Sequence, residues 1–233
     1  MPEHPWFAID DPDEDDFFEF TATELAFVDA LSDRTAPWAG TDVSGLVCRS
    51  DSWDSLVAHL TLLDSDRTRH LIDIGVHFYG DRVRGDRLHN QLLTLTDSPS
   101  SWHLEATGTV EELAQQSAEW FRAVLRKPVV LYVWLNDDRW AYAARFAFAD
   151  TNQTISQVYN EDLAPPGQAE ALIAAGHVHG QGWIQTIGLP APTLYQHIRG
   201  DLGTAALPPG VPAVTKRGPI RGLWYEGIQD EQR

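Results

Sequence analysis

Residues 109–149 decide the fold class, and they read TVEELAQQSAEWFRAVLRKPVVLYVWLNDDRWAYAARFAFA. At the start of this stretch, the Thr109 hydroxyl can accept a hydrogen bond from the backbone near Glu112 while the Glu112 carboxylate reaches back, which is the capping-box pattern. Apolar residues then recur on one helical face, and Pro128 stops the helix. The sequence therefore predicts a helix from Thr109 to about Arg126.

The remainder of the stretch predicts an antiparallel hairpin. A strand-length apolar run over 129–135 is followed by a polar turn at 136–138, and residues 139–149 alternate large and small side chains. We expect the alanine face to admit a helix close to the sheet. The aromatic face, with Trp140, Tyr142 and Phe146, would fill a second layer or line a ligand groove.

The flanking regions extend this pattern in both directions. Residues 69–79 alternate with the period of a half-buried strand. Helices are predicted over 24–31 with Thr23 as the cap, around Leu56, Leu60 and Leu63, over 169–175 and over 192–197. After the strand over 69–79 we expect an arginine-rich loop over 82–87 and then a short hairpin of 92–96 with 102–106. The expected fold class is α+β, mainly antiparallel sheet with helices packed on one face.

Composition shifts predict three regions along the 233 residues. Residues 1–20 are expected to form an acidic flexible arm, 21–202 a single α+β domain, and 203–233 a tail rich in Pro and Gly. The one cysteine, Cys48, excludes an internal disulfide and a multi-cysteine metal site and fits a reducing, cytoplasmic location. No apolar run reaches the roughly 18 residues that a membrane helix needs, so we expect no membrane partner.

The negative charge is concentrated at the start of the chain. The net charge is −17, and residues 1–33 contain eleven acidic residues and no Lys or Arg. Carboxylates interleaved with aromatic rings are typical of a segment that binds a basic, partly apolar surface, whereas a solvated arm anchored by its Phe residues is the alternative. Nucleic acid is excluded as a partner because phosphate binding needs a basic surface. The residues expected to bind are Asp13, Glu14, Asp15, Asp16, Phe17 and Phe18.

The sequence Gly176-His177-Val178-His179-Gly180 is the candidate metal site. In a strand, His177 and His179 would point to the same face, as two ligands of one divalent metal must. Asp73 and His77 share another strand face and could supply a third ligand if the strands were neighbours. Exposed or merely hydrogen-bonded histidines are the alternative, and no other cofactor is expected.

Signals of catalysis are few. His103 and Glu105 alternate on one strand face, where a carboxylate can orient an imidazole as a base, and Cys48 next to Arg49 could be an activated thiol. Such pairs are common on wet sheet faces, and a lone cysteine among apolar residues is usually part of a core. The phosphate-loop, dinucleotide, nucleophile-elbow and zinc-protease motifs do not occur in the sequence.

One resemblance can be read from the sequence. WHLEATGT at 102–109, followed by EEL at 111–113, WF at 120–121 and RKPV at 126–129, resembles a strand–helix–strand segment of uncharacterised actinobacterial proteins. The resemblance covers about residues 102–129. It implies a bacterial source and a local fold, and no activity.

Two functional hypotheses follow. In the first, the chain is a non-enzymatic protein-binding protein, such as an immunity or antitoxin-like protein or a small regulator, which uses an acidic surface against a basic partner. The alternative is an enzyme, or a protein that binds a small ligand or metal, with a groove near Trp140, Tyr142, His177 and His179.

Overall fold

The computed structural model describes residues 6–7, 20–40, 43–50, 54–64, 70–89, 93–180 and 182–214. Contacts within the chain divide it into two compact units, Met1–Arg126 and Lys127–Arg233. The one domain expected over 21–202 is therefore described below as unit 1 and unit 2. Among the described residues, no helix is long and apolar enough to cross a membrane.

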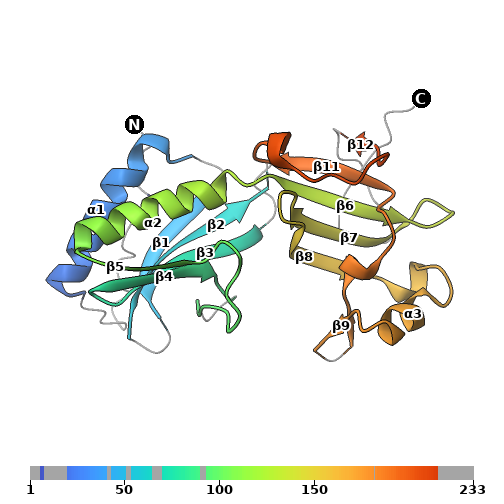
Figure 1. Cartoon of the computed structure of the whole chain (residues 1–233), viewed down its shortest axis with the longest axis horizontal. Coiled ribbons are helices and arrows are strands. Elements are labelled where there is room, and N and C mark those ends of the chain that lie inside the picture. Colours follow the sequence, from blue (N-terminus) through green and yellow to red (C-terminus); the bar gives the residue numbers. More distant parts are fainter. Residues whose placement is uncertain are drawn as a thin grey trace, which may run out of the picture. The chain divides into compact units, whose positions relative to one another are not determined.

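Unit 1 is a five-stranded antiparallel meander with two helices, shown in blue to green in Figure 1. The strands pair in the order in which they occur along the chain. Its elements are α1 (Ala22–Thr35), the single 3-10 turn Ala36–Trp38, β1 (Val43–Arg49), β2 (Leu56–Leu63), β3 (His70–Phe78), β4 (Arg82–Arg87), β5 (Leu104–Thr107) and α2 (Val110–Leu125).

Both helices of unit 1 lie together on one face of the sheet (Figure 1). The Phe27 ring of α1 stacks on the Phe78 ring of β3, with 4.3 Å between the ring centroids. Since side chains alternate along a strand, Ile72, Ile74 and Val76 face the helices with Phe78, and all of them are buried. The α+β class, with helices on one face of an antiparallel sheet, is confirmed for this unit.

Both helices of unit 1 begin with a capping box. Thr109 accepts from the Glu112 backbone N–H and the Glu112 carboxylate accepts from the Thr109 backbone, as the sequence predicts. For α1 the cap is Thr21, and not Thr23, because Glu24 is the carboxylate that completes the box.

Three further predictions in unit 1 are wrong. The segment Leu56–Leu63 is strand β2 and not a helix, since it is hydrogen-bonded between β1 and β3. The arginine-rich run Arg82–Arg87 is strand β4 and not a loop, and β5 pairs with β4 instead of with residues 92–96. An isolated bridge between Leu88 and Leu95 is the pairing observed for the latter segment.

Unit 2 is built on a second five-stranded sheet, ordered β12-β11-β6-β7-β8. The predicted hairpin is its centre, and β12 alone pairs in parallel, with β11. Residues 194–199 form strand β11 and not the predicted helix. The elements are β6 (Val129–Leu135), β7 (Ala141–Phe148), β8 (Gln153–Tyr159), η2 (Glu161–Leu163), α3 (Gln168–Ala174), β9 (Val178–His179), β10 (Trp183–Ile184), η3 (Thr186–Gly188), β11 (Leu194–Arg199), η4 (Leu202–Thr204) and β12 (Ala213–Val214).

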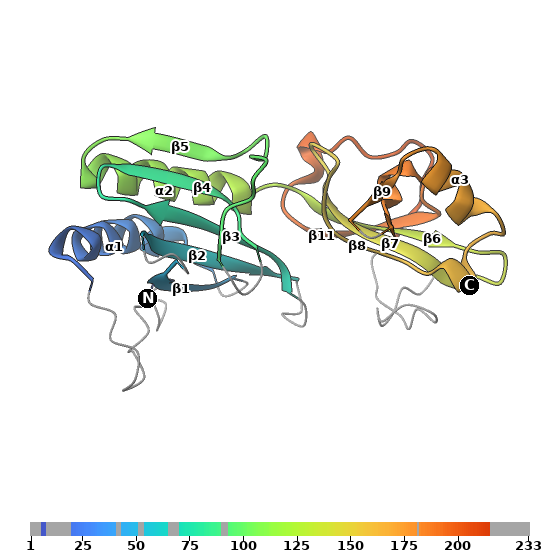
Figure 2. The same ribbon diagram turned by 90° about the horizontal axis from the view of Figure 1, so that it is seen from below.

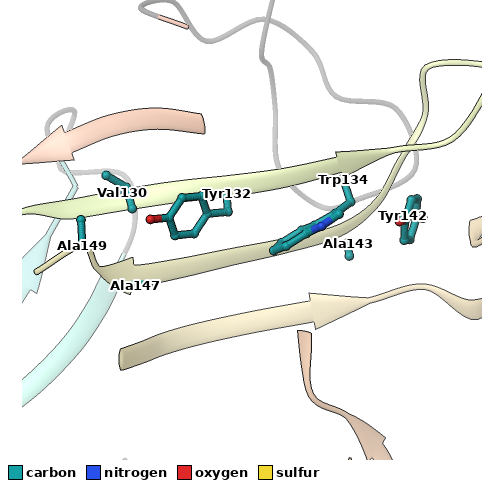
Figure 3. Packing of buried hydrophobic residues seen from close by; sticks show 7 residues of the cluster. All are labelled: Val130, Tyr132, Trp134, Tyr142, Ala143, Ala147 and Ala149. Carbon is teal, nitrogen blue, oxygen red and sulfur yellow. The ribbon is translucent and has the colours of Figure 1, made fainter. Parts of the chain in front are cut away.

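The two central strands of this sheet are buried on both faces. All eight residues of β7 are buried, as are the first six of β6. On one face, large rings of β6 lie against small residues of β7, and Figure 3 shows Tyr132 and Trp134 beside Ala143 and Ala147. Single turns and loops cover this face, through Leu163, Leu189, Leu202 and Leu207.

Candidate functional site

Most of the large apolar side chains that reach solvent lie in one short region of unit 2. Within the described part of the chain, four large hydrophobic residues are classed as exposed. Trp183 is 71% exposed, Ile173 is 53% exposed and Ile187 is 52% exposed, whereas Leu25 in unit 1 reaches only 39%. A tryptophan this exposed leaves most of its apolar surface in water, which makes this region the candidate contact surface.

Backbone hydrogen bonds join the elements that carry these three residues. The His177 N–H donates to the Leu172 carbonyl at the end of α3 at 2.9 Å, and the Gln185 N–H donates to the His177 carbonyl at 2.9 Å. Figures 1 and 2 both show α3 beside β9. We call residues 168–188, which include α3, β9, β10 and η3, the apolar corner.

A side-chain contact fixes the apolar corner to the sheet of unit 2. Gln157 of β8 accepts from both the Thr186 backbone at 2.9 Å and the Thr186 hydroxyl at 2.7 Å. Thr186 is buried, whereas its neighbour Ile187 is exposed. The corner therefore presents Ile187 from a turn that is held in place.

The stretch of sequence that contains the apolar corner has formal charge of one sign only. Residues 146–198 contain no Lys or Arg. Glu161, Asp162 and Glu170 lie in or beside the corner and are all exposed. These three exposed carboxylates lie close in sequence to the exposed apolar side chains, and negative charge of this kind complements a basic surface.

The two histidines of the predicted metal site lie in this corner. His179 is exposed and pairs with Trp183 across the β9–β10 hairpin. His177 is half-buried, and its ring lies so close to Gly188 that a Cβ built there would be 2.3 Å from the ring. No group of three His, Cys, Asp or Glu suited to a metal ion occurs within the residues that the structure describes, so the metal site stays a prediction from two ligands.

The other residues expected to bind fall into two groups. Asp13 to Phe18 lie outside the described residues. Tyr142 is buried, and Gln168 of α3 donates to its hydroxyl at 3.4 Å. The Tyr142 and Tyr159 rings meet edge to face, and burial, together with Tyr142 and nearby carboxylates, raises the pKa of Tyr159 to about 12. The Tyr142 side chain is thus packed inside unit 2, while Trp140 is half-buried.

In unit 1, Asp73 and His77 share a face of β3 but have separate partners. Asp73 Oδ1 accepts from the Thr61 hydroxyl at 2.6 Å and lies 2.9 Å from Nε2 of His70. Burial raises the pKa of Asp73, but the hydrogen bonds from His70 and Thr61 outweigh it, so this pKa lies below its usual value. The hydrogen bond with Asp73 raises the pKa of His70, against the opposing effect of burial.

His77 is held between two fixed groups. Its Nδ1 lies 2.9 Å from the Ser55 hydroxyl, and its Nε2 lies 2.8 Å from the Leu93 carbonyl oxygen. With the proton on Nε2, the ring donates to Leu93 and accepts from Ser55. Burial lowers the pKa of His77, and Ser55 is itself only 1% exposed, so the pair is closed to a substrate and fastens residues 93–95 to the sheet.

The two remaining catalytic candidates, the His103–Glu105 pair and Cys48, make only local contacts. His103 and Glu105 are both exposed, and the His103 ring bonds to the Ser100 carbonyl at 2.8 Å. Glu105 lies opposite Arg84 in the β4–β5 ladder. Cys48 is half-buried in β1, with its sulfur 4.0 Å from the Val57 carbonyl oxygen. None of these contacts joins an imidazole to a nucleophile.

Comparisons with known proteins identify no relative. No protein family, curated protein or solved structure matches the chain significantly. The functional argument therefore depends on the surfaces and side chains described above.

Sequence reasoning found the histidines of the apolar corner and missed its apolar side chains. Large apolar residues such as Trp183 and Ile187 are usually buried in a folded protein, so their residue types alone do not predict exposure. The available signal was the composition of residues 146–198, where acidic residues occur without any basic ones.

Proposed function

We propose that the chain is a non-enzymatic protein-binding protein that uses the apolar corner against a basic partner. The observation that supports this proposal most directly is the exposure of Trp183, at 71%, in a short segment of the chain that also exposes Ile173 and Ile187. Trp is among the residues that most often dominate binding energy at interfaces. Immunity proteins, antitoxin-like proteins and small regulators are examples of the class.

The charge distribution specifies the chemistry of the partner. The partner has an apolar pocket that receives Trp183, and Lys or Arg around that pocket meet Glu161, Asp162 and Glu170. A net charge of −17 on the whole chain increases the rate of encounter with such a protein at low ionic strength. Association is accordingly expected to weaken as salt is raised.

The proposal is tested with the full chain as bait in extracts of its host, at low and moderate salt. Wild type should retain a basic protein that Trp183→Ala fails to retain, because truncating a central interface Trp costs about 2 kcal/mol or more, a loss of about thirtyfold or more in affinity. Leu25→Ala is the matched control, since Leu25 is an exposed apolar residue of unit 1, and it should retain the partner.

Two results would contradict the proposal. One is that wild type and Trp183→Ala retain the same proteins in the same amounts. The other is that the retained protein is acidic or binds independently of salt.

A further inference from the structure

Arg145 is a charged residue in the interior of unit 2. It lies in the middle of β7, opposite Tyr132 of β6 and Gln157 of β8, and it is only 6% exposed. The guanidinium carbon lies 5.1 Å from the centroid of the Tyr132 ring and 5.9 Å from that of Trp134. These cation–π contacts hold the side chain over the rings that project from β6 in Figure 3.

The hydrogen-bonding capacity of Arg145 is mostly unused. Nη2 donates to the side-chain oxygen of Asn152 at 2.8 Å. Nε and Nη1 are buried and have no hydrogen-bond partner among the residues that the structure describes. Buried donors without a partner are rare in native proteins, and each one costs about 1–3 kcal/mol, or more when the group is charged.

Arg145 also lacks a counter-charge. In the described part of the chain, its one hydrogen-bonding partner is the neutral Asn152, and Arg145 forms no ion pair there. Burial lowers the pKa of Arg145, with Tyr132 opposing the shift, yet a guanidinium stays protonated at any physiological pH. A trapped water could accept from the free N–H groups, but it would leave the positive charge uncompensated.

We propose that unit 2 binds a small monocarboxylate with an apolar body, whose carboxylate pairs with the Arg145 guanidinium. This site uses none of the exposed side chains of the apolar corner and carries a function beyond protein binding. The free N–H groups of a guanidinium point along its plane, and a planar carboxylate accepts from them in that plane.

The surroundings of Arg145 favour an organic monoanion over phosphate. Ala143 and Ala147 lie beside Arg145 on the same face of β7, and Leu189, Leu202 and Leu207 pack on this face from the covering loops. Such an environment stabilises an apolar body, whereas a hydrated dianion would lose more solvation than one arginine returns.

Access to Arg145 requires the cover to open. The segments over this face are the single turns η2 and η4 and the loops that carry Leu189 and Leu207, and not long helices. Short turns with few backbone hydrogen bonds open locally at a lower free-energy cost than strands or long helices. The ligand therefore enters by displacing these turns and is enclosed once bound.

The test uses the full chain with sodium benzoate and sodium octanoate as probes and inorganic phosphate at matched ionic strength. Titration calorimetry should show saturable binding of at least one carboxylate with one site per chain, and at least about tenfold weaker binding of phosphate. Arg145→Met should weaken carboxylate binding at least about tenfold, since a charge-assisted hydrogen bond is lost. Arg126→Met, at an exposed arginine, should bind as wild type does.

A second readout needs no variant. In the wild-type protein, the NMR signal of the Arg145 Nε–H group should shift as the carboxylate is added and saturate at the same concentration as the heat. The proposal is overturned if neither carboxylate gives saturable binding, if Arg145→Met binds equally well, if phosphate binds more tightly, or if the Arg145 signal does not respond.

Discussion

At the scale of single residues, the His70–Asp73 pair predicts a pH-dependent part of the stability. Because the pKa of His70 is raised in the folded state, its contribution is fully present below the unfolded pKa of about 6.5 and is lost as pH rises through the folded value. Asp73, with a lowered pKa, stays ionised across this range. His70→Asn should therefore destabilise the protein more at about pH 5.5 than at about pH 8.5. The difference should be below about 1 kcal/mol, since the His70 side chain is 47% exposed.

Urea denaturation of variant and wild type at both pH values measures this difference. Burial lowers the pKa of His59, so its protonation destabilises the fold as pH falls; comparing the two proteins at each pH removes this contribution of burial and leaves only the repulsion between His59 and His70. His103→Asn, at an exposed histidine, should change stability equally at both pH values. Equal losses for His70→Asn at the two pH values would show that the ion pair contributes nothing.

At the scale of elements, the two helices of unit 1 offer a matched comparison. Glu24 and Glu112 both occupy the third helical position of a capping box, but only Glu24 also bonds to a strand, where Arg49 Nη2 of β1 donates to it at 2.7 Å. Both side chains of that ion pair are 12% exposed. Glu24→Gln should lower the free energy of unfolding by about 1–3 kcal/mol, because it leaves Arg49 without that carboxylate.

Glu112→Gln is the control. It should lower the free energy of unfolding less than Glu24→Gln does, because Glu112 is exposed and water can take over the hydrogen bonds of its carboxylate. Chemical denaturation of both variants gives the comparison. If the two substitutions lower the free energy of unfolding equally, the ion pair between Glu24 of α1 and Arg49 of β1 adds no stability beyond that of the capping box. In that case α1 is held against the sheet by its apolar face alone.

The capping boxes also show what could be predicted from local sequence. The Thr109 box and the hairpin over 129–149 were predicted because their signals are local: a cap, a helical apolar face, a turn and an alternation. Segment Leu56–Leu63 was misassigned because Leu56, Leu60 and Leu63 have helical spacing. The strand pairs with β1 on one side and β3 on the other, and such non-local pairing overrides the local pattern.

The candidate sites were predictable only in part, for the same reason. His177 and His179 stand out in the sequence, but the exposure of Trp183 depends on where β9 and β10 lie relative to α3. Arg145 looks like the polar member of an alternating strand. It is buried because turns and loops more than fifteen residues away along the chain cover the face of β7 on which it lies.

At the scale of the whole molecule, the acidic residues are concentrated in two regions of the chain, and we expect both to act on the same basic partner. Eleven acidic residues precede residue 34, and the described body adds a region from 146 to 198 without any Lys or Arg. The first lies mostly outside the described residues, and the second contains the apolar corner. We expect a basic partner to depend on the apolar corner for affinity and on the remaining negative charge for its association rate. Trp183→Ala should therefore mainly speed dissociation of the complex, whereas added salt should mainly slow its association.

The division of the chain at Arg126 and Lys127 predicts that each unit folds without the other. Each has its own sheet, and unit 1 buries the helix-facing side of that sheet under α1 and α2, so it contains the apolar contacts that a cooperative transition requires. Residues 1–126 and 127–233, made separately, should each unfold cooperatively in urea and give near-ultraviolet circular dichroism from packed aromatic rings. If either piece shows neither property, the two units depend on each other for stability, and the single domain expected over 21–202 is the better description of how the chain folds.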